Sequence, residues 1–300
     1  MYDLNIPWPV DNYTAKPTPS QITQLKNTII TNYTLGITHQ VINYSITVET
    51  TKIPINTPHE INPINIATLE LGQFPKLKLF TRLTLVVTDS SKIQHLTKLQ
   101  NHFDIIAIQP QTEKCLQLTI TNLDIDLISL NLSTRLPFFL KHKIIGMAIE
   151  KGIKFEICYN WLISGSIGYD GNHANLQLIK KNFFNNVLQL IRASRSRGLV
   201  VSSGASQPLQ LRNSNDILII LKTLGLDKSR GKSCVTVNPE RVLVNGRLRI
   251  KSYKQTISVN NDVNLGENDC ENQVKKSDLQ GYKRKLTDTD TGKLLKKFKS

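Results

Sequence analysis

Apolar segments of strand length recur along the chain, and a segment with helical periodicity follows almost every one of them. The apolar segments are rich in β-branched residues and nearly continuous, which is typical of parallel strands buried on both faces. The predicted strands span residues 79–87, 103–108, 123–130, 153–159, 199–201 and 235–237. The predicted helices span residues 91–100, 113–121, 141–151, 172–197 and 213–224. This alternation predicts an α/β fold in which helices cover a parallel sheet.

Two more segments, 2–6 and 38–48, raise the number of predicted strands to about eight, which is the number that closes a TIM barrel. We therefore expect a TIM-barrel-like (β/α) domain over residues 1–250. An open doubly wound sheet is the alternative architecture. Neither G-x-G-x-x-G nor G-x-x-x-x-G-K-[ST] follows any predicted strand, which argues against a nucleotide-binding version of that sheet.

The last part of the chain, residues 251–300, has no hydrophobic periodicity and is rich in Asn, Asp, Lys and Thr. This composition predicts a disordered basic tail. Two basic clusters lie near its end: Lys283-Arg284-Lys285 and Lys296-Lys297. Their spacing suits a bipartite nuclear import signal, so we expect a nuclear protein. A basic tail that adds loose affinity for RNA is the alternative, and the two are compatible.

Basic side chains are concentrated in about a quarter of the chain. The 300 residues contain 38 Lys and Arg against 23 Asp and Glu, a net charge of +15. Residues 180–250 hold 13 basic and three acidic side chains, whereas residues 1–179 hold 14 and 13. Eight of those 13 are Arg, whose planar guanidinium matches phosphate oxygens and stacks on exposed bases. The segment therefore favours a nucleic-acid partner, and a solvated basic surface without a ligand is the alternative.

The sequence offers no membrane segment and no redox or zinc motif. No apolar run approaches the roughly 18 residues of a membrane span, and the N-terminus lacks the features of a secretory signal, so no membrane partner is expected. The four cysteines are far apart in sequence, which predicts reduced, unpaired thiols. They are Cys115, Cys158, Cys234 and Cys270.

Candidate catalytic groups are few. The six histidines form no H-x-H or H-E-x-x-H motif, so a metal hydrolase lacks its usual ligands. Glu156 lies in a predicted strand, and if it faces inward it needs a cationic partner such as Arg82. No G-x-S-x-G motif surrounds Ser202. We therefore predict no catalytic residue and no metal site. A metal-dependent phosphoesterase on the same barrel, with Glu156 essential, is the alternative function.

Seven short motifs occur in a fixed order along the chain. They are Arg82-Leu83-Thr84, Phe103-Asp104-Ile105-Ile106-Ala107, Asp126-Leu127-Ile128-Ser129-Leu130, Ala148-Ile149-Glu150-Lys151-Gly152-Ile153, Phe155-Glu156-Ile157-Cys158-Tyr159, Ser202-Ser203-Gly204-Ala205 and Asn238-Pro239-Glu240-Arg241-Val242-Leu243. Together they resemble the thirty-kilodalton protein subunit of ribonuclease P, which eukaryotes share with ribonuclease MRP. The similarity covers roughly residues 1–250 and includes little of the Asn-rich stretch 31–74.

The resemblance implies a TIM-barrel-like subunit of a ribonucleoprotein in which the RNA, not this chain, performs the hydrolysis. It implies removal of tRNA 5′ leaders and, through the MRP particle, processing of ribosomal RNA. The implied partners are the catalytic RNA, a small RRM-like protein subunit and other subunits, with pre-tRNA met indirectly. No cofactor is expected on this chain, although Mg²⁺ is expected for the RNA catalyst. A nucleolar location within the nucleus is also expected.

The residues that we expect to contact RNA are basic or polar and lie around the Ser202–Ala205 turn and its flanking helices. Hydroxyl and N–H groups of that turn are expected to be exposed at the barrel mouth, where they suit phosphate or sugar contacts. The full set is Arg192, Arg195, Arg197, Ser202, Ser203, Arg212, Arg230, Lys232, Arg241, Arg247 and Arg249. A third hypothesis, besides RNA binding and phosphoesterase activity, is an assembly protein whose basic face meets acidic protein partners.

Overall fold

The computed structural model describes residues 1–48, 61–89, 99–163, 176–253 and 257–258. The chain divides into two units, Met1–Val263 and Asn264–Ser300, and every described residue belongs to the first. The clusters of the predicted import signal, and nearly all of the predicted tail, lie outside the described residues.

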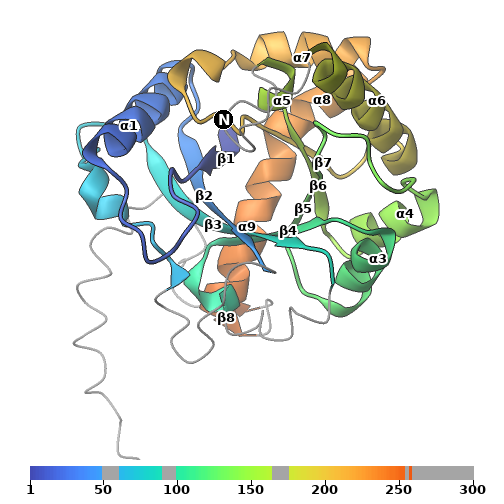
Figure 1. Ribbon diagram of the computed structural model, residues 1–300, viewed down its shortest axis with the longest axis horizontal. Coiled ribbons are helices and arrows are strands. Elements are labelled where there is room, and N and C mark those ends of the chain that lie inside the picture. The colour runs from blue at the N-terminus through green and yellow to red at the C-terminus, as the bar shows by residue number, and fades with distance from the viewer. Residues whose placement is uncertain (49–60, 90–98, 164–175, 254–256, 259–300) are drawn as a thin grey trace, which may run out of the picture. The chain divides into compact units, whose positions relative to one another are not determined.

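Seven strands form one parallel sheet, in which each strand pairs with the next one along the chain. They are β1 (Tyr2–Pro7), β2 (His39–Thr47), β3 (Lys78–Val87), β4 (Ile105–Pro110), β5 (Leu127–Ser129), β6 (Lys154–Cys158) and β7 (Leu199–Ser202). Figure 1 shows the strands arranged as a ring with helices around it. The predicted TIM-barrel-like fold is confirmed, with seven strands in the described part of the ring where about eight were expected.

Helices cover the outside of this ring, except α9, which lies across one end of it. The α-helices are α1 (Pro19–Thr34), α3 (Glu113–Asn122), α4 (His142–Glu150), α5 (Asn160–Ile163), α6 (Leu176–Ser194), α7 (Ser214–Thr223), α8 (Lys228–Val235) and α9 (Val237–Lys251). Short 3-10 turns are η2 (Ile66–Leu69), η4 (Gln100–His102) and η5 (Pro208–Gln210), and β8 (Ser252–Tyr253) pairs antiparallel with β9 (Ile257–Ser258). No helix in the described part of the chain is long and apolar enough to cross a membrane.

The ring closes between its first and last strands through the turn that follows β7. The N–H of Gly204 and the hydroxyl of Ser203 both donate to the carbonyl oxygen of Asn5, at 2.9 and 3.1 Å. The N–H of Ser203 also donates to the Asp3 carboxylate at 2.9 Å. Burial raises the pKa of Asp3, although its hydrogen bonds act in the opposite direction. These contacts link β1 to the turn after β7, the first and last strands of the sheet, which do not pair with each other as a ladder.

Most predicted strands are confirmed, but the one at 235–237 is wrong. Val235 ends α8 and Val237 begins α9. The Asp227 carboxylate accepts a hydrogen bond from the Ser229 N–H at 3.2 Å, and this cap starts a helix that runs through to Val235. An apolar stretch of three residues is too short to distinguish a strand from a helix.

The predicted helices are confirmed wherever the structure describes them, but α1, α5, α8 and α9 were not predicted. Helix α1 has clear start signals. Thr18 and Gln21 form a capping box at its start, and Pro19 occupies its first position. The predicted helix 172–197 ends at Ser194. Most of the predicted helix 91–100 lies outside the described residues.

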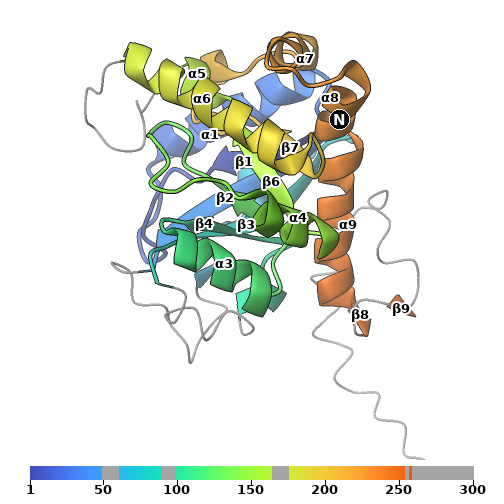
Figure 2. The same cartoon turned by 90° about the vertical axis from the view of Figure 1, so that its right-hand side faces the viewer.

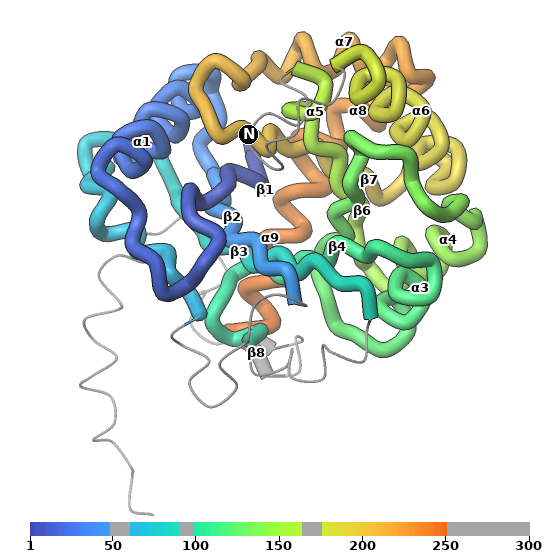
Figure 3. The backbone as a smooth tube through the Cα atoms, in the orientation of Figure 1, coloured from blue at the N-terminus to red at the C-terminus, as the bar shows by residue number. Residues whose placement is uncertain are grey.

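Helix α9 lies across the N-terminal ends of the strands. Figure 2 shows it at one end of the barrel, and Figure 3 shows it crossing the middle of the ring. The Asn238 side chain donates to the carbonyl oxygen of Leu199 at the start of β7, at 2.7 Å. Eleven residues later, Arg249 pairs with Asp126, directly before β5. The helix therefore spans this mouth of the barrel and seals it.

A fully buried ion pair occupies the barrel interior. Both guanidinium nitrogens of Arg82 on β3 donate to the Glu156 carboxylate on β6, at 2.6 and 2.7 Å. Arg82 also donates to the Leu4 carbonyl oxygen at 2.9 Å and to the Thr84 hydroxyl at 3.0 Å. Burial raises the pKa of Glu156, but the charge and hydrogen bonds of Arg82 lower it further, so the net pKa is below its ordinary value. The predicted pairing of Glu156 with Arg82 is confirmed.

We predict that Arg82→Met lowers the free energy of unfolding by about 3 to 5 kcal/mol, because it leaves the Glu156 carboxylate charged and unpaired in the interior. Urea denaturation monitored by circular dichroism measures the change. The double variant Arg82→Met, Glu156→Leu is expected to recover much of this loss, since both charges are then absent. A single variant as stable as the wild type would contradict the buried pair.

The same ion pair makes the stability of the domain depend on pH in the acidic range. Because the folded pKa of Glu156 lies below its ordinary value of 4.5, the stabilisation is present above about pH 4.5 and is lost as pH falls through the folded value. The wild type should therefore lose stability in acid more steeply than the double variant, as measured by thermal melts at a series of pH values. Parallel profiles would show that Glu156 does not contribute.

We also predict that Gly246→Ala destabilises the domain by about 2 kcal/mol, because a Cβ there would collide with the carbonyl oxygen of Asp104. This oxygen is backbone and cannot move aside like a flexible side chain. Asn245→Ala, one position earlier on the exposed face of α9, is the matched control. Equal melting temperatures of the two variants would mean that α9 does not press on the strand ends as closely as the structure has it.

Candidate functional site

The barrel interior does not supply the groups that a hydrolase needs. Both oxygens of the Glu156 carboxylate are held by Arg82, so this side chain has no free oxygen for a metal or a water nucleophile. Among the residues that the structure describes, no group of three or more His, Cys, Asp or Glu side chains could hold a metal ion. The alternative of a metal-dependent phosphoesterase is therefore not favoured.

The Ser202–Ala205 turn is buried, so the expectation of exposed hydroxyls is wrong. Ser202 and Ser203 are each 1% exposed. Ser203 uses its N–H and its hydroxyl to close the barrel against β1, as described above. Gly204 has a φ of +62°, and a Cβ there would lie 3.3 Å from the Cβ of Cys158. Barrel closure explains this motif, and the two serines are not presented to a ligand by the folded chain.

Two of the expected RNA-binding arginines serve the contact between α9 and the strand ends. Arg247 is 6% exposed, and its guanidinium lies 5.8 Å from the centroid of the Phe80 ring. Arg249 pairs with Asp126 and donates to the carbonyl oxygen of Phe103 at 3.3 Å. Burial raises the pKa of Asp126, although the charge of Arg249 counteracts this. The folded chain therefore does not present Arg247 and Arg249 on its surface, which corrects the expected site.

The other seven expected residues are exposed. None of them forms an ion pair with a carboxylate in the described part of the chain. They are Arg192, Arg195, Arg197, Arg212, Arg230, Lys232 and Arg241. Their positive charge is therefore available to an anionic partner.

The structure brings three of the exposed arginines together. Arg230, on α8, donates to the carbonyl oxygen of Arg195 at 2.6 Å, which places the two helix ends side by side. Arg192 and Arg195 line one hollow at the end of α6. We refer to Arg192, Arg195 and Arg230 as the α6–α8 cluster. Since α6 runs back to the start of β7, this cluster lies near the barrel end that α9 seals.

The remaining exposed residues do not all share this location. Arg241, on α9, lies near Lys154 at the start of β6, and both burial and the charge of Arg241 lower the pKa of Lys154. Arg212 follows β7, whereas Arg197 precedes it, so the two lie at opposite ends of that strand. The basic residues therefore do not converge on a single rim.

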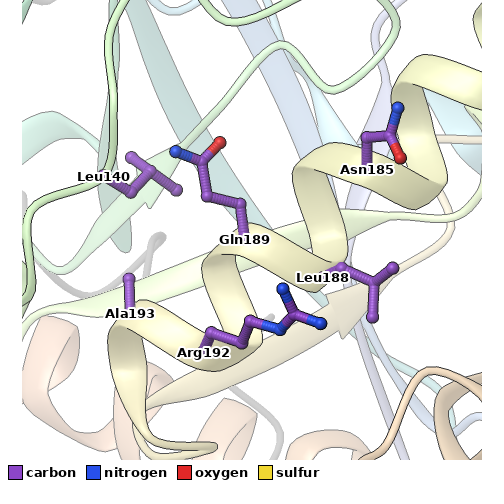
Figure 4. Close-up of a pocket in the computed structure, with 6 residues that line it drawn as sticks. All are labelled: Leu140, Asn185, Leu188, Gln189, Arg192 and Ala193. Carbon is purple, nitrogen blue, oxygen red and sulfur yellow. The ribbon is translucent and has the colours of Figure 1, made fainter.

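The hollows that flank α6 were not predicted. One of them, about 410 Å³, lies between this helix and the segment before α4. Figure 4 shows Leu188 and Arg192 projecting from α6 there, with Gln189 extending toward Leu140. A hydrogen bond between His142 and the carbonyl oxygen of Ala193 ties α4 to α6 beside this hollow. Only the packing of α4 against α6 brings residues 50 positions apart in sequence to one surface.

This chain is similar to known proteins in both sequence and fold. The family described as RNase P subunit p30 matches residues 1–251. The Saccharomyces cerevisiae ribonuclease P/MRP protein subunit RPP1 is 41% identical over 259 residues, which cover 86% of this chain and 84% of the relative. The mouse ribonuclease P protein subunit p30 is 28% identical over 239 residues, which cover 78% of this chain and 85% of the relative.

A chain from a cryo-EM structure of archaeal ribonuclease P with mature tRNA shares the fold, with a TM-score of 0.56 and 15% sequence identity. The match covers 87% of this chain and 98% of the archaeal chain. The family match extends over the whole barrel and ends where α9 ends. The chain therefore belongs to the RNase P subunit p30 family.

Proposed function

We propose that this chain is an RNA-binding protein subunit of ribonuclease P and ribonuclease MRP. It supports the RNA-catalysed removal of tRNA 5′ leaders and the processing of ribosomal RNA, and does not itself supply catalytic groups. Its direct partner is the RNA of the particle, and its interaction with pre-tRNA is indirect, through that RNA. The observation that carries the proposal is the α6–α8 cluster, in which three exposed arginines converge without a carboxylate partner in the described part of the chain.

Arginine clusters of this kind suit a polyanion. Each guanidinium offers a planar set of donors to phosphate oxygens, and the contacts are independent of base sequence. The domain also contains arginines that stabilise its own fold, so basic composition alone does not distinguish the two uses. Exposure makes that distinction, because Arg192 and Arg230 are exposed, whereas Arg247 is buried and Arg249 is nearly buried and paired with Asp126.

Other features of the proposal follow from family membership and from the composition of the tail. We propose a small RRM-like protein as a further partner, Mg²⁺ as the cofactor of the RNA catalyst, and a nuclear, nucleolar location directed by Lys283-Arg284-Lys285 and Lys296-Lys297. Recovery of the tagged protein from cells, followed by sequencing of the RNA that accompanies it, tests the main proposal. Enrichment of the RNA subunits of ribonuclease P and MRP is expected. Recovery of protein partners alone, unaffected by RNase treatment, would instead support the assembly-protein hypothesis.

We predict that the double variant Arg192→Ala, Arg230→Ala weakens binding of the full chain to a ribonuclease P RNA transcript by about tenfold or more, because two phosphate contacts are lost. The slope of log Kd against log salt should also become shallower by roughly one to two units. Filter binding at several salt concentrations measures both quantities.

The matched control removes two charges elsewhere on the surface. Lys76→Ala with Lys114→Ala changes the net charge by the same amount, at exposed positions outside residues 180–250. Its RNA affinity should stay within about twofold of the wild type, since only general attraction is reduced. Equal losses in the two double variants would mean that net charge, and not the α6–α8 cluster, determines RNA binding.

A further inference from the structure

Four helices of the domain end in the same hydrogen-bonded turn. In each, the first residue after the cap donates to the carbonyl three positions back, and the next residue donates to the carbonyl five positions back, which defines a Schellman motif. The pairs are Gly36–Tyr33 and Ile37–Asn32 after α1, Gly152–Ile149 and Ile153–Ala148 after α4, Gly225–Lys222 and Leu226–Leu221 after α7, and Arg195–Arg192 and Ser196–Ile191 after α6. These four ends can therefore be compared position by position.

Three of the ends share one residue pattern. The first residue after the cap is glycine, with φ values of +89°, +96° and +87° at Gly36, Gly152 and Gly225. The next residue is a buried apolar side chain, which is Ile37, Ile153 or Leu226. This is the favourable solution, because glycine adopts the left-handed conformation without a steric penalty and the apolar residue packs against the helix.

The end of α6 departs from the pattern at both positions. Arg195 has a φ of +52° and Ser196 a φ of +59°, so two consecutive residues with side chains occupy the left-handed region. No buried apolar residue follows, because Ser196 stands where the other turns have Ile or Leu. A left-handed backbone is unfavourable for both residues. The conformation is therefore maintained at a cost that the other three ends avoid.

Contacts among the described residues do not explain why position 195 is an arginine. The Arg195 side chain is exposed and has no ion-pair partner in the described part of the chain. Arg192 already places a positive charge in the last turn of α6, where it suits the helix dipole. The backbone of Arg195 accepts a hydrogen bond from Arg230, and glycine at position 195 would offer the same carbonyl oxygen.

The surroundings of Arg195 suit a nucleotide chain. Arg195 and Arg192 border a hollow of about 530 Å³ between the ends of α6 and α7. Its other lining residues include Leu188, Ile191 and Leu224, which give it an apolar wall. A cationic rim beside an apolar wall matches a phosphodiester backbone whose sugars and bases lie against carbon.

We propose that the strained turn at the end of α6 is an RNA phosphate-binding site, in which Arg195 is the main contact and Arg192 and Arg230 flank it. This inference rests on the proposed function. It adds that Arg195 is the main phosphate contact and that its strained backbone serves binding. Strain of this kind tends to persist where the surrounding structure holds a residue in place for function.

The test separates folding from binding at one residue. Arg195→Gly relieves the strain and removes the charge, so its melting temperature should rise by about 2 °C while its affinity for a ribonuclease P RNA transcript falls by about tenfold. Lys76→Ala is the matched control: it removes one positive charge at an exposed position outside residues 180–250, so its RNA affinity and melting temperature should stay close to those of the wild type. Arg195→Gln keeps the strain and loses the charge, so it should bind as weakly as Arg195→Gly with an unchanged melting temperature.

Three results would overturn the inference. They are wild-type affinity in Arg195→Gly, an equal loss of affinity in Lys76→Ala, or a lower melting temperature in Arg195→Gly, which would mean that the arginine stabilises the turn. If the wild-type chain itself does not bind the transcript, the proposed function fails instead. The wild-type measurement thus distinguishes the two failures.

Discussion

The fold depends on pairing the polar groups that a small parallel barrel encloses. Arg82 and Glu156 are fully buried, and each would be costly to bury alone. Their bidentate contact, with the Leu4 carbonyl and the Thr84 hydroxyl, fills the space that a larger barrel would leave for a ligand. Because Arg82 lies on β3 and Glu156 on β6, the pair also joins strands from opposite parts of the ring. The polar side chains of the barrel interior therefore stabilise the fold.

A second constraint is the N-terminal mouth of the barrel, which α9 seals. The helix lies so close to the strand ends that a Cβ at position 246 would collide with the carbonyl oxygen of Asp104. Arg247 and Arg249 turn toward Phe80 and Asp126 as part of this seal. The basic segment of the sequence therefore contains arginines that complete the fold and arginines that remain on the surface. Three of the latter, Arg192, Arg195 and Arg230, lie together where α6 ends and α8 begins.

Periodicity predicted the barrel well, because buried parallel strands give nearly continuous apolar runs whatever their partners. It failed at 235–237, where a short apolar stretch lies between a capped helix and α9. The pairing of Glu156 with Arg82 was predictable, since an inward carboxylate requires a cation. The roles of Ser203 and Arg249 were not, because local sequence does not reveal that the turn after β7 meets β1 or that α9 crosses the strand ends. Only the folded structure shows that Arg249 is paired with Asp126 at the strand ends, whereas Arg192 is exposed.

The central claim is that the surface where α6 ends and α8 begins, and not the barrel interior or the turn after β7, contacts RNA. Hydrogen–deuterium exchange of the full chain, alone and saturated with ribonuclease P RNA, tests it most directly. The account predicts slower exchange on RNA binding for amides in residues 191–197 and 228–232, with no change in the Ser202–Ala205 turn or around Gly246. Protection confined to that turn or to α9, with none at the ends of α6 and α8, would contradict it.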